Sequence, residues 1–280
     1  HTAVGYAALS SNTTGVNHTA VGKDSLRANT TGTRNTAVGH ASLEINTTGS
    51  DNVALGDYAL YNNTTASNNT AVGKDALLSN TTGTGNIGIG YTALQANTTA
   101  NDNVSVGVSA LYTNTTGASN VAVGRSALQN NTTASNNTAM GYAALNANTT
   151  GSENTAVGKS AADAVTTGTR TVAVGYNAGG GITTGDSNVA IGYQALMTED
   201  EHSNNVAVGA SALQTQNAGA HAYNTAVGFE AGKANTTGIY NTAVGANTLL
   251  ANTTGGYNTA VGMQALTANT TANNNVAMGY

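Results

Sequence analysis

The amino-acid sequence predicts an all-β parallel β-solenoid of about 16 coils, and three observations lead to that prediction. A 17-residue unit repeats along the whole chain of 280 residues. Each unit contains a short stretch in which β-branched or aliphatic residues alternate with small ones, which is typical of a β-strand. Each unit also contains Gly, and twelve units contain Asn-Thr-Thr followed by Gly or Ala, which are segments of the kind that form turns.

The repeat is marked by a Gly that follows an aliphatic residue. Fifteen of the sixteen intervals between these glycines are 17 residues, and one is 19. A typical unit, residues 35–51, reads NTAVGHASLEINTTGSD. We therefore expect a single repeat array over residues 1–280, with an irregular segment at 197–223. Because the sequence starts and stops inside a unit, we expect it to be a fragment of a longer chain.

The length of the unit favours a solenoid over helical repeats or disorder. Seventeen residues suit one coil made of two strands of about five residues joined by turns. A helix pair needs roughly 30 residues or more, and the Gly-rich punctuation would break such helices. Low charge and few aromatic residues can indicate disorder, but the strict register argues against it. Coils stacked about 4.8 Å apart would form a rod of roughly 75–80 Å.

The aligned columns predict how each coil packs. The residue three before Gly is β-branched in all seventeen cases, the residue one before is aliphatic, and the residue between them is small. One strand face therefore carries Thr, Val and Ile, and the other carries Ala, Ser or Gly. Leu recurs in the second half of thirteen of sixteen units. We expect the repeated Asn amides to hydrogen-bond from coil to coil.

The glycines of the repeat are expected to lie at turns that need a positive φ or leave no room for a Cβ atom. These coil-turn glycines include Gly22, Gly39, Gly56 and Gly73.

The aliphatic column is a candidate oligomer interface. If it points outward, it forms an apolar stripe on the order of 500 Å² or more, above what soluble monomers usually expose. A parallel homotrimer would bury the stripe. The alternative is a monomer in which the stripe faces the interior of its own coil. The interface residues are Val21, Val38, Leu55, Val72, Ile89, Val106, Val123 and Met140.

Two short motifs carry a resemblance to known fibres. NVAIG at 188–192 and NTAVG at 35–39 resemble the head repeats of trimeric autotransporter adhesins, the YadA-like left-handed parallel β-roll. Arrays of NTAVG, AL and NTTG are also similar to phage-type tail-fibre and related surface-fibre repeats. The resemblance implies a left-handed coil, a trimer and an extracellular location on a bacterial surface or a virion. The 17-residue period is longer than that of the adhesin heads, and no neck, stalk, anchor or self-cleaving chaperone tail is recognisable.

Composition and motifs argue against several functions. Eight Lys and Arg residues are scattered singly and the net charge is −5, which does not favour binding to nucleic acid or to an anionic membrane. No apolar run approaches the length of a membrane-spanning helix. The absence of Cys fits an exported protein that does not depend on disulfides. Ser and Thr form ladders without a partnered His and acid, and the glycines make no phosphate loop. We expect neither enzyme activity nor a cofactor.

The irregular segment contains the weak candidates for a metal site. Counting back from the next Gly, His202 and His221 occupy the same column one coil apart, and Glu199 and Asp200 lie near. A cation site is one interpretation. The other, a solvated loop, is favoured because these residue types alone do not define a ligand geometry.

Two neighbouring units depart from the core pattern. Val165 and Ile182 replace the Asn of the Asn-Thr-Thr turn, and Ala162 and Gly179 replace the Leu. We interpret these changes as compensated core swaps.

The residue after each Gly varies freely, which indicates a solvent-facing column. It is a possible recognition surface or ordinary surface decoration, and its aromatic members include Tyr6, Tyr142, Tyr193 and Phe229. In addition, twelve units carry Asn-Thr-Thr, the acceptor pattern for N-glycosylation. In a glycosylating pathway these turns would be expected to bear a regular row of sugars.

The leading functional hypothesis is a structural or adhesive extracellular fibre segment. It would give reach and multivalent attachment to a host-surface or matrix receptor that the sequence does not identify. The alternatives are a self-assembling extracellular filament or matrix protein and an ice-binding solenoid. Regular Thr columns favour ice binding, but no Thr array two residues wide is evident.

Overall fold

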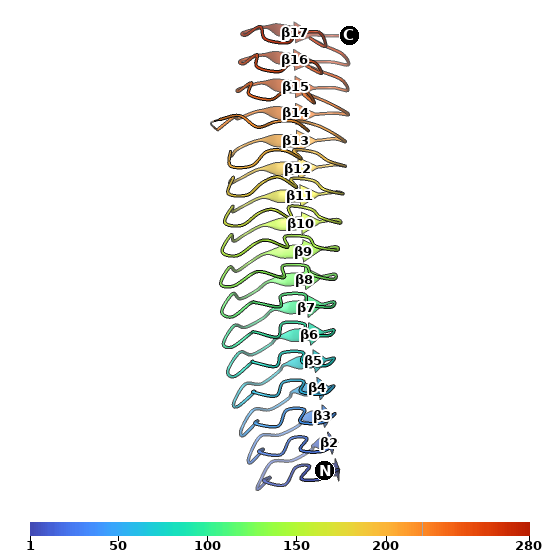
Figure 1. The fold of residues 1–280 in the computed structure, drawn as a ribbon, viewed down its shortest axis with the longest axis vertical. Helices are drawn as coiled ribbons and strands as arrows, with labels where there is room; N and C mark the ends of the chain where they lie inside the picture. The colour runs from blue at the N-terminus through green and yellow to red at the C-terminus, as the bar shows by residue number, and fades with distance from the viewer. Residues whose placement is uncertain (220) are drawn as a thin grey trace. The chain divides into compact units, whose positions relative to one another are not determined.

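The computed structural model describes every residue of the chain except residue 220. It divides into two compact units, residues 1–137 and 138–280. Each unit is a parallel β-solenoid whose successive coils stack on one another (Figure 1). The described residues form no helix. The prediction of an all-β parallel solenoid of about 16 coils with a 17-residue repeat is confirmed.

Each coil contributes one three-residue strand. The first unit contains β1 (Thr2–Val4), β2 (Thr19–Val21), β3 (Thr36–Val38), β4 (Val53–Leu55), β5 (Thr70–Val72), β6 (Ile87–Ile89), β7 (Val104–Val106) and β8 (Val121–Val123). The second contains β9 (Thr138–Met140), β10 (Thr155–Val157), β11 (Val172–Val174), β12 (Val189–Ile191), β13 (Val206–Val208), β14 (Thr225–Val227), β15 (Thr242–Val244), β16 (Thr259–Val261) and β17 (Val276–Met278).

Neighbouring strands within a unit pair in parallel and in register. Ala37 of β3 pairs with Ala54 of β4, and Val38 pairs with Leu55, so equivalent residues of adjacent repeats lie side by side. Strands β13 and β14 keep this register even though Val206 and Thr225 are 19 residues apart. The two extra residues are therefore accommodated outside the strands.

The second half of the coil differs from the expectation of two strands per coil. It is a run of turns in which the residues two and four positions after the Gly have positive φ, as in Ala41 and Leu43, both at 52°. The backbone still bonds to both neighbouring coils. The Ala41 N–H donates to Lys23 O in the preceding coil, and the Leu43 N–H donates to Ala59 O in the following coil, each at 2.9 Å.

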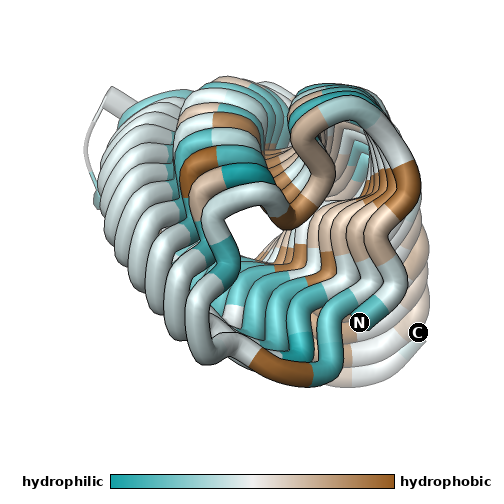
Figure 2. Tube along the Cα trace, turned by 90° about the horizontal axis from the view of Figure 1, so that it is seen from below, coloured by the Kyte–Doolittle hydropathy of each residue, from teal (hydrophilic) through white to brown (hydrophobic). Residues whose placement is uncertain are grey.

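The core of each coil is narrow and is built from Ala and Leu. The central Ala of the strand points inward and Leu from the turn segment meets it, so Ala54 and Leu60 are fully buried. Figure 2 looks along the coils and shows hydrophobic positions recurring at the same place from one coil to the next. The face with small side chains is therefore the inner one.

The core swaps in the second unit are compensated as predicted. Gly179 lacks the Leu side chain, and Ile182 fills the space, because a Cβ built on Gly179 would lie 3.0 Å from Ile182 Cδ1. Ala162 and Val165 are likewise both buried. An apolar residue in the Asn column thus replaces the volume lost from the Leu column.

The coil-turn glycines Gly22, Gly39, Gly56 and Gly73 meet both conditions expected of them. Gly39 has a φ of +137°, and a Cβ on it would lie 2.5 Å from Gly56 O in the next coil. An L side chain is excluded there by conformation and by contact.

Two columns of Asn run through the turns and bond from coil to coil. In the Asn-Thr-Thr column, Asn63 Nδ2 donates to Asn46 Oδ1 at 2.9 Å and to Ala66 O at 3.0 Å. In the column before the strand, Asn35 Oδ1 accepts the backbone N–H of Asn52 at 3.0 Å. The predicted Asn ladders are confirmed, and they satisfy backbone groups that would otherwise be buried without partners.

Candidate functional site

The outer face of the strands carries the aliphatic column of the repeat. Val38 and Leu55 are each 37% exposed, while Ala37 and Ala54 beside them are 0% exposed. The alternative in which the aliphatic column faces the interior of its own coil is therefore wrong. The candidate interface residues of the first unit lie on successive in-register strands: Val21, Val38, Leu55, Val72, Ile89, Val106 and Val123. Met140 holds the equivalent position in β9 of the second unit.

The variable column after the Gly is exposed, as expected. Its candidate recognition residues are exposed by 51% to 77%: Tyr6, Tyr142, Tyr193 and Phe229. In the second unit, Tyr176 stacks on Tyr193 with ring centroids 5.4 Å apart. Lys159 Nζ lies 6.0 Å from the Tyr142 ring and 5.7 Å from the Tyr176 ring. Over residues 142–193, four coils of this column thus form a strip of aromatic rings with one ammonium group between two of them.

A second aromatic column was missed from the sequence. Tyr223, Tyr240 and Tyr257 stack in three successive coils, with centroids 5.3 and 5.0 Å apart. Their 17-residue spacing in the sequence was a usable signal. Because the rings stack on one another, most of their faces are covered, and they present mainly edges and hydroxyl groups.

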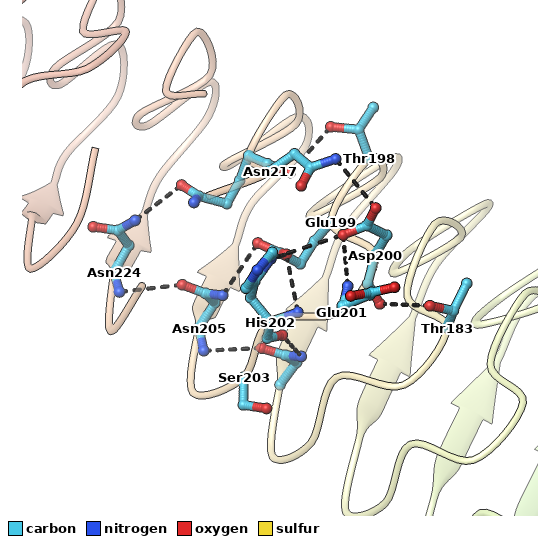
Figure 3. Close-up of polar contacts among 12 residues, drawn as sticks. Thr183, Thr198, Glu199, Asp200, Glu201, His202, Ser203, Asn205, Asn217 and Asn224 are labelled. Carbon is cyan, nitrogen blue, oxygen red and sulfur yellow. Dashed lines mark hydrogen bonds and ion pairs between the residues drawn. The ribbon is translucent and has the colours of Figure 1, made fainter. Parts of the chain in front are cut away.

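The acidic turn brings three of the four weak metal candidates together (Figure 3). One potential ligand atom from each of Glu199, Asp200 and His202 lies within 4.8 Å of the others. His202 Nδ1 is 2.9 Å from Glu199 Oε1 and 3.7 Å from Asp200 Oδ1. His221 does not join them, since its exposed ring lies against Tyr223, with the ring centroids 6.3 Å apart. The column match between the two histidines did not predict their proximity.

Glu199 has a structural role that explains its burial. It occupies the position of Asn in the Asn-Thr-Thr column, here called the inner Asn column, and is 0% exposed. Its carboxylate accepts from the His202 N–H at 3.3 Å and from Asn205 Nδ2 at 3.4 Å. Burial raises the pKa of Glu199, and the contacts with His202 oppose that rise. One coil further on, Gln216 Oε1 accepts from Asn224 Nδ2 at 2.9 Å, so the inner column continues with a different amide.

The arrangement favours a structural turn over a cation site, but the expectation that the loop is solvated was wrong for Glu199, which is 0% exposed. The Glu199 oxygens already accept hydrogen bonds from the turn and from the adjacent Asn column, so the carboxylate does there what Asn does in other coils. The described residues enclose no pocket beside the cluster or elsewhere. Among the described residues there is also no helix that could span a membrane.

Comparisons with known proteins assign this chain to no family. No protein-family model matches the chain, and neither a curated protein nor a solved structure matches it. The fold and the surface columns therefore define the class of protein, which is a parallel β-solenoid repeat protein with an outward apolar stripe.

Proposed function

We propose that this chain is a structural and adhesive segment of an extracellular fibre, on a bacterial cell surface or a virion, whose copies associate side by side as a parallel homotrimer. The observation that carries the proposal is the outward aliphatic stripe on the strands, with Val38 and Leu55 more than a third exposed on neighbouring coils. Contiguous apolar stripes of this kind mark protein interaction sites. The proposal includes neither enzyme activity nor a cofactor.

A second copy of the same chain suits the stripe because of its regularity. Equivalent residues recur at one strand spacing, so two parallel copies in register present matching rows along the whole contact. Three thin coils around one axis would enclose a narrow aliphatic core. The left hand of the coil and the count of three follow the adhesin heads that the sequence resembles.

The adhesive part of the proposal rests on the columns away from the strands. The aromatic strip with Tyr142, Lys159 and Tyr193 would remain outside the assembly, repeated once per copy. Such repetition strengthens weak contacts with a host-surface or matrix receptor by raising their effective concentration.

The test is the mass of the purified chain in solution by light scattering. We expect a discrete trimer, and we expect Val38→Asp together with Val123→Asp to convert it to a folded monomer, since both side chains lie on the outer face. Ala37→Asp is the matched control, because its side chain points into the core and should unfold the coil. A wild-type chain that is monomeric at all concentrations would contradict the proposal.

An ice-binding function is a second candidate, favoured by the regular outer face of the strands. Thr and Val columns stand in register on that face, as in Thr19 with Thr36 and Val21 with Val38. Thermal hysteresis in a monomeric sample would support ice binding. A mass that grows without limit as the protein concentration rises would support the other alternative, a self-assembling extracellular filament. Under the fibre proposal neither is expected.

A further inference from the structure

The fold separates the N-glycosylation sequons of this chain into two structural classes. All are Asn-X-Ser/Thr motifs, the acceptor pattern. The first class contains the twelve Asn-Thr-Thr turns. Their Asn residues form the ladder of hydrogen-bonded amides in the inner Asn column. The second class lies at other positions of the coil that solvent reaches. Its exposed members are Asn17, Asn68, Asn130 and Asn136, and Asn62 is half-buried. The one remaining motif, at Asn103, belongs with the buried class, because Asn103 is 0% exposed and its Nδ2 donates to Gly117 O at 2.9 Å.

In the first class the reacting atom is buried and already bonded. Ten of the twelve Asn residues are no more than 2% exposed. Asn80 is typical, with Nδ2 donating to Asn63 Oδ1 at 3.0 Å and to Gly83 O at 2.9 Å. Both amide hydrogens are therefore used inside the coil. The two half-buried members, Asn12 and Asn269, also donate Nδ2 to the carbonyl three residues on, at 3.0 and 3.2 Å.

Glycan transfer needs that same nitrogen. A bond forms between Asn Nδ2 and the anomeric carbon of the sugar, while the bond from that carbon to a polyprenyl diphosphate breaks. The amide loses one proton, and the diphosphate leaves. A glycan on Nδ2 of Asn80 would remove one ladder hydrogen and would place a bulky group where Asn63 of the neighbouring coil lies. The expected row of sugars on the Asn-Thr-Thr turns is thus incompatible with the folded coil.

In the second class the side chain points away from the coil. Asn68 is exposed, and it lies at a position of positive φ (63°) that follows the buried turn. Its backbone N–H is bonded to Ser50 O at 3.0 Å, so the main chain is held while the side chain is outside. A substituent there would extend into solvent without breaking a ladder contact.

We propose that the folded chain can carry N-linked glycans only at this exposed class, and that modification of an Asn-Thr-Thr turn and folding of its coil exclude one another. A chain exported through a glycosylating pathway would be modified on the turns before folding and would then fail to fold. Substitution of a turn asparagine alone would remove its ladder amide. The coils with Val165 and Ile182 dispense with that amide, and there the Leu column changes as well, to Ala162 and Gly179.

The first experiment uses the wild-type chain. Purified folded protein, and the same protein unfolded and then diluted, are incubated with an oligosaccharyltransferase and a lipid-linked oligosaccharide, and site occupancy is mapped by mass spectrometry. We expect glycans on the turns only in the unfolded sample, and on Asn68 or its class in the folded one. Turn occupancy in protein that remains folded, or a folded sample that takes no glycan at all, would overturn the proposal.

The second experiment uses a matched pair from one coil and needs no enzyme. The chain has no Cys, so Asn68→Cys and Asn63→Cys each carry a single thiol that a neutral sugar iodoacetamide can alkylate. We expect Asn63→Cys to react at least ~100-fold more slowly than Asn68→Cys in the native state, since reaction requires the coil to open. Alkylated Asn68→Cys should keep its Tm within about 2 °C.

Because Asn63→Cys removes a ladder amide, its folding is checked by circular dichroism. If that variant does not fold, Thr64→Cys and Thr65→Cys provide the comparison, with Thr65 exposed and the Thr64 hydroxyl bonded to Thr81 O at 3.1 Å. Equal native reactivity within the pair used, or a large loss of Tm on alkylation of Asn68→Cys, would refute the assignment of the two classes.

Discussion

At the scale of the residue, the backbone conformation explains the choice of Leu in the core. Every Leu in the column four positions after the Gly has a φ between 46° and 54°. Positive φ is unfavourable for β-branched side chains, and the residues that replace Leu there are Ala162, Gly179 and Gly232. Ile182 and Val165 appear only in the Asn column, where φ is not positive. Thus the aliphatic residues are sorted by backbone conformation as well as by volume.

Leu60→Ile should therefore be more harmful than its conserved volume suggests. Such swaps usually cost less than about 1.5 kcal/mol, but here the β-branched carbon must adopt a φ of 52°. We expect a loss above about 2 kcal/mol, measured by urea unfolding. Leu60→Met, which is unbranched at Cβ, is the control and should stay below about 1.5 kcal/mol. Equal losses for the two variants would contradict this explanation.

Gly39→Ala should destabilise the chain by about 3 kcal/mol or more, since it adds a positive-φ cost to a contact with the backbone of the next coil. Gly85→Asn is the matched control. Gly85 has a φ of +69° in a column where Asn68 and Asp102 adopt the same conformation, and its near neighbour is the movable Asp102 side chain. Thermal unfolding followed by circular dichroism compares the two, and similar Tm values would refute the prediction.

At the scale of the coil, some features could be predicted from the sequence and others could not. The alternation in Thr36-Ala37-Val38 was enough to predict a strand, and the recurrence of Asn was enough to predict the ladders. The prediction of a second strand in each coil was wrong, because Ala-Leu pairs fit a strand pattern equally well. Pairs of residues with positive φ are hard to recognise in a sequence unless they are Gly or Asn. The contact of Glu199 with His202 depends on the course of one irregular turn, which the repeat does not determine.

The buried carboxyl of that turn should make its stability depend on pH. Burial raises the pKa of Glu199, so the folded coil binds this proton more tightly than the unfolded chain does. Its contribution to stability is therefore fully present below the ordinary carboxyl pKa of 4.5 and is lost as the pH rises through the raised pKa. Glu199→Gln should remove this dependence and slow amide exchange in residues 198–205 near neutral pH.

Glu201→Gln is the control for this effect, because Glu201 is exposed on the same turn. It should leave both the pH dependence and the exchange rates unchanged. His202 and Asp200 are unchanged in both variants. If Glu199→Gln exchanges faster than wild type at neutral pH, the carboxylate stabilises the turn in its charged form and the expected sign is wrong.

At the scale of the whole molecule, both units are built from the same coil, so length and register can be varied separately. Deleting residues 37–53 removes 17 residues and joins Thr36 to Ala54, which restores a normal strand. Deleting residues 37–52 removes 16 and leaves one extra residue in the strand, which reverses the faces of part of it.

We expect the 17-residue deletion to keep its Tm within about 5 °C of the parent, because repeat stability is a sum over neighbouring coils. The 16-residue deletion should lose far more, although the two variants differ by one residue. Differential scanning calorimetry measures both. Similar Tm values would mean that the coil tolerates a change of register, contrary to the fixed inner and outer faces.

The pairing of each strand with the one a single repeat away has a consequence for synthesis. Almost every tertiary hydrogen bond joins residues about 17 positions apart, as in Leu43 N–H to Ala59 O. Topologies dominated by such short separations fold quickly. A segment leaving a ribosome or an export channel could thus dock on the coil made just before it, without waiting for any distant part of the chain.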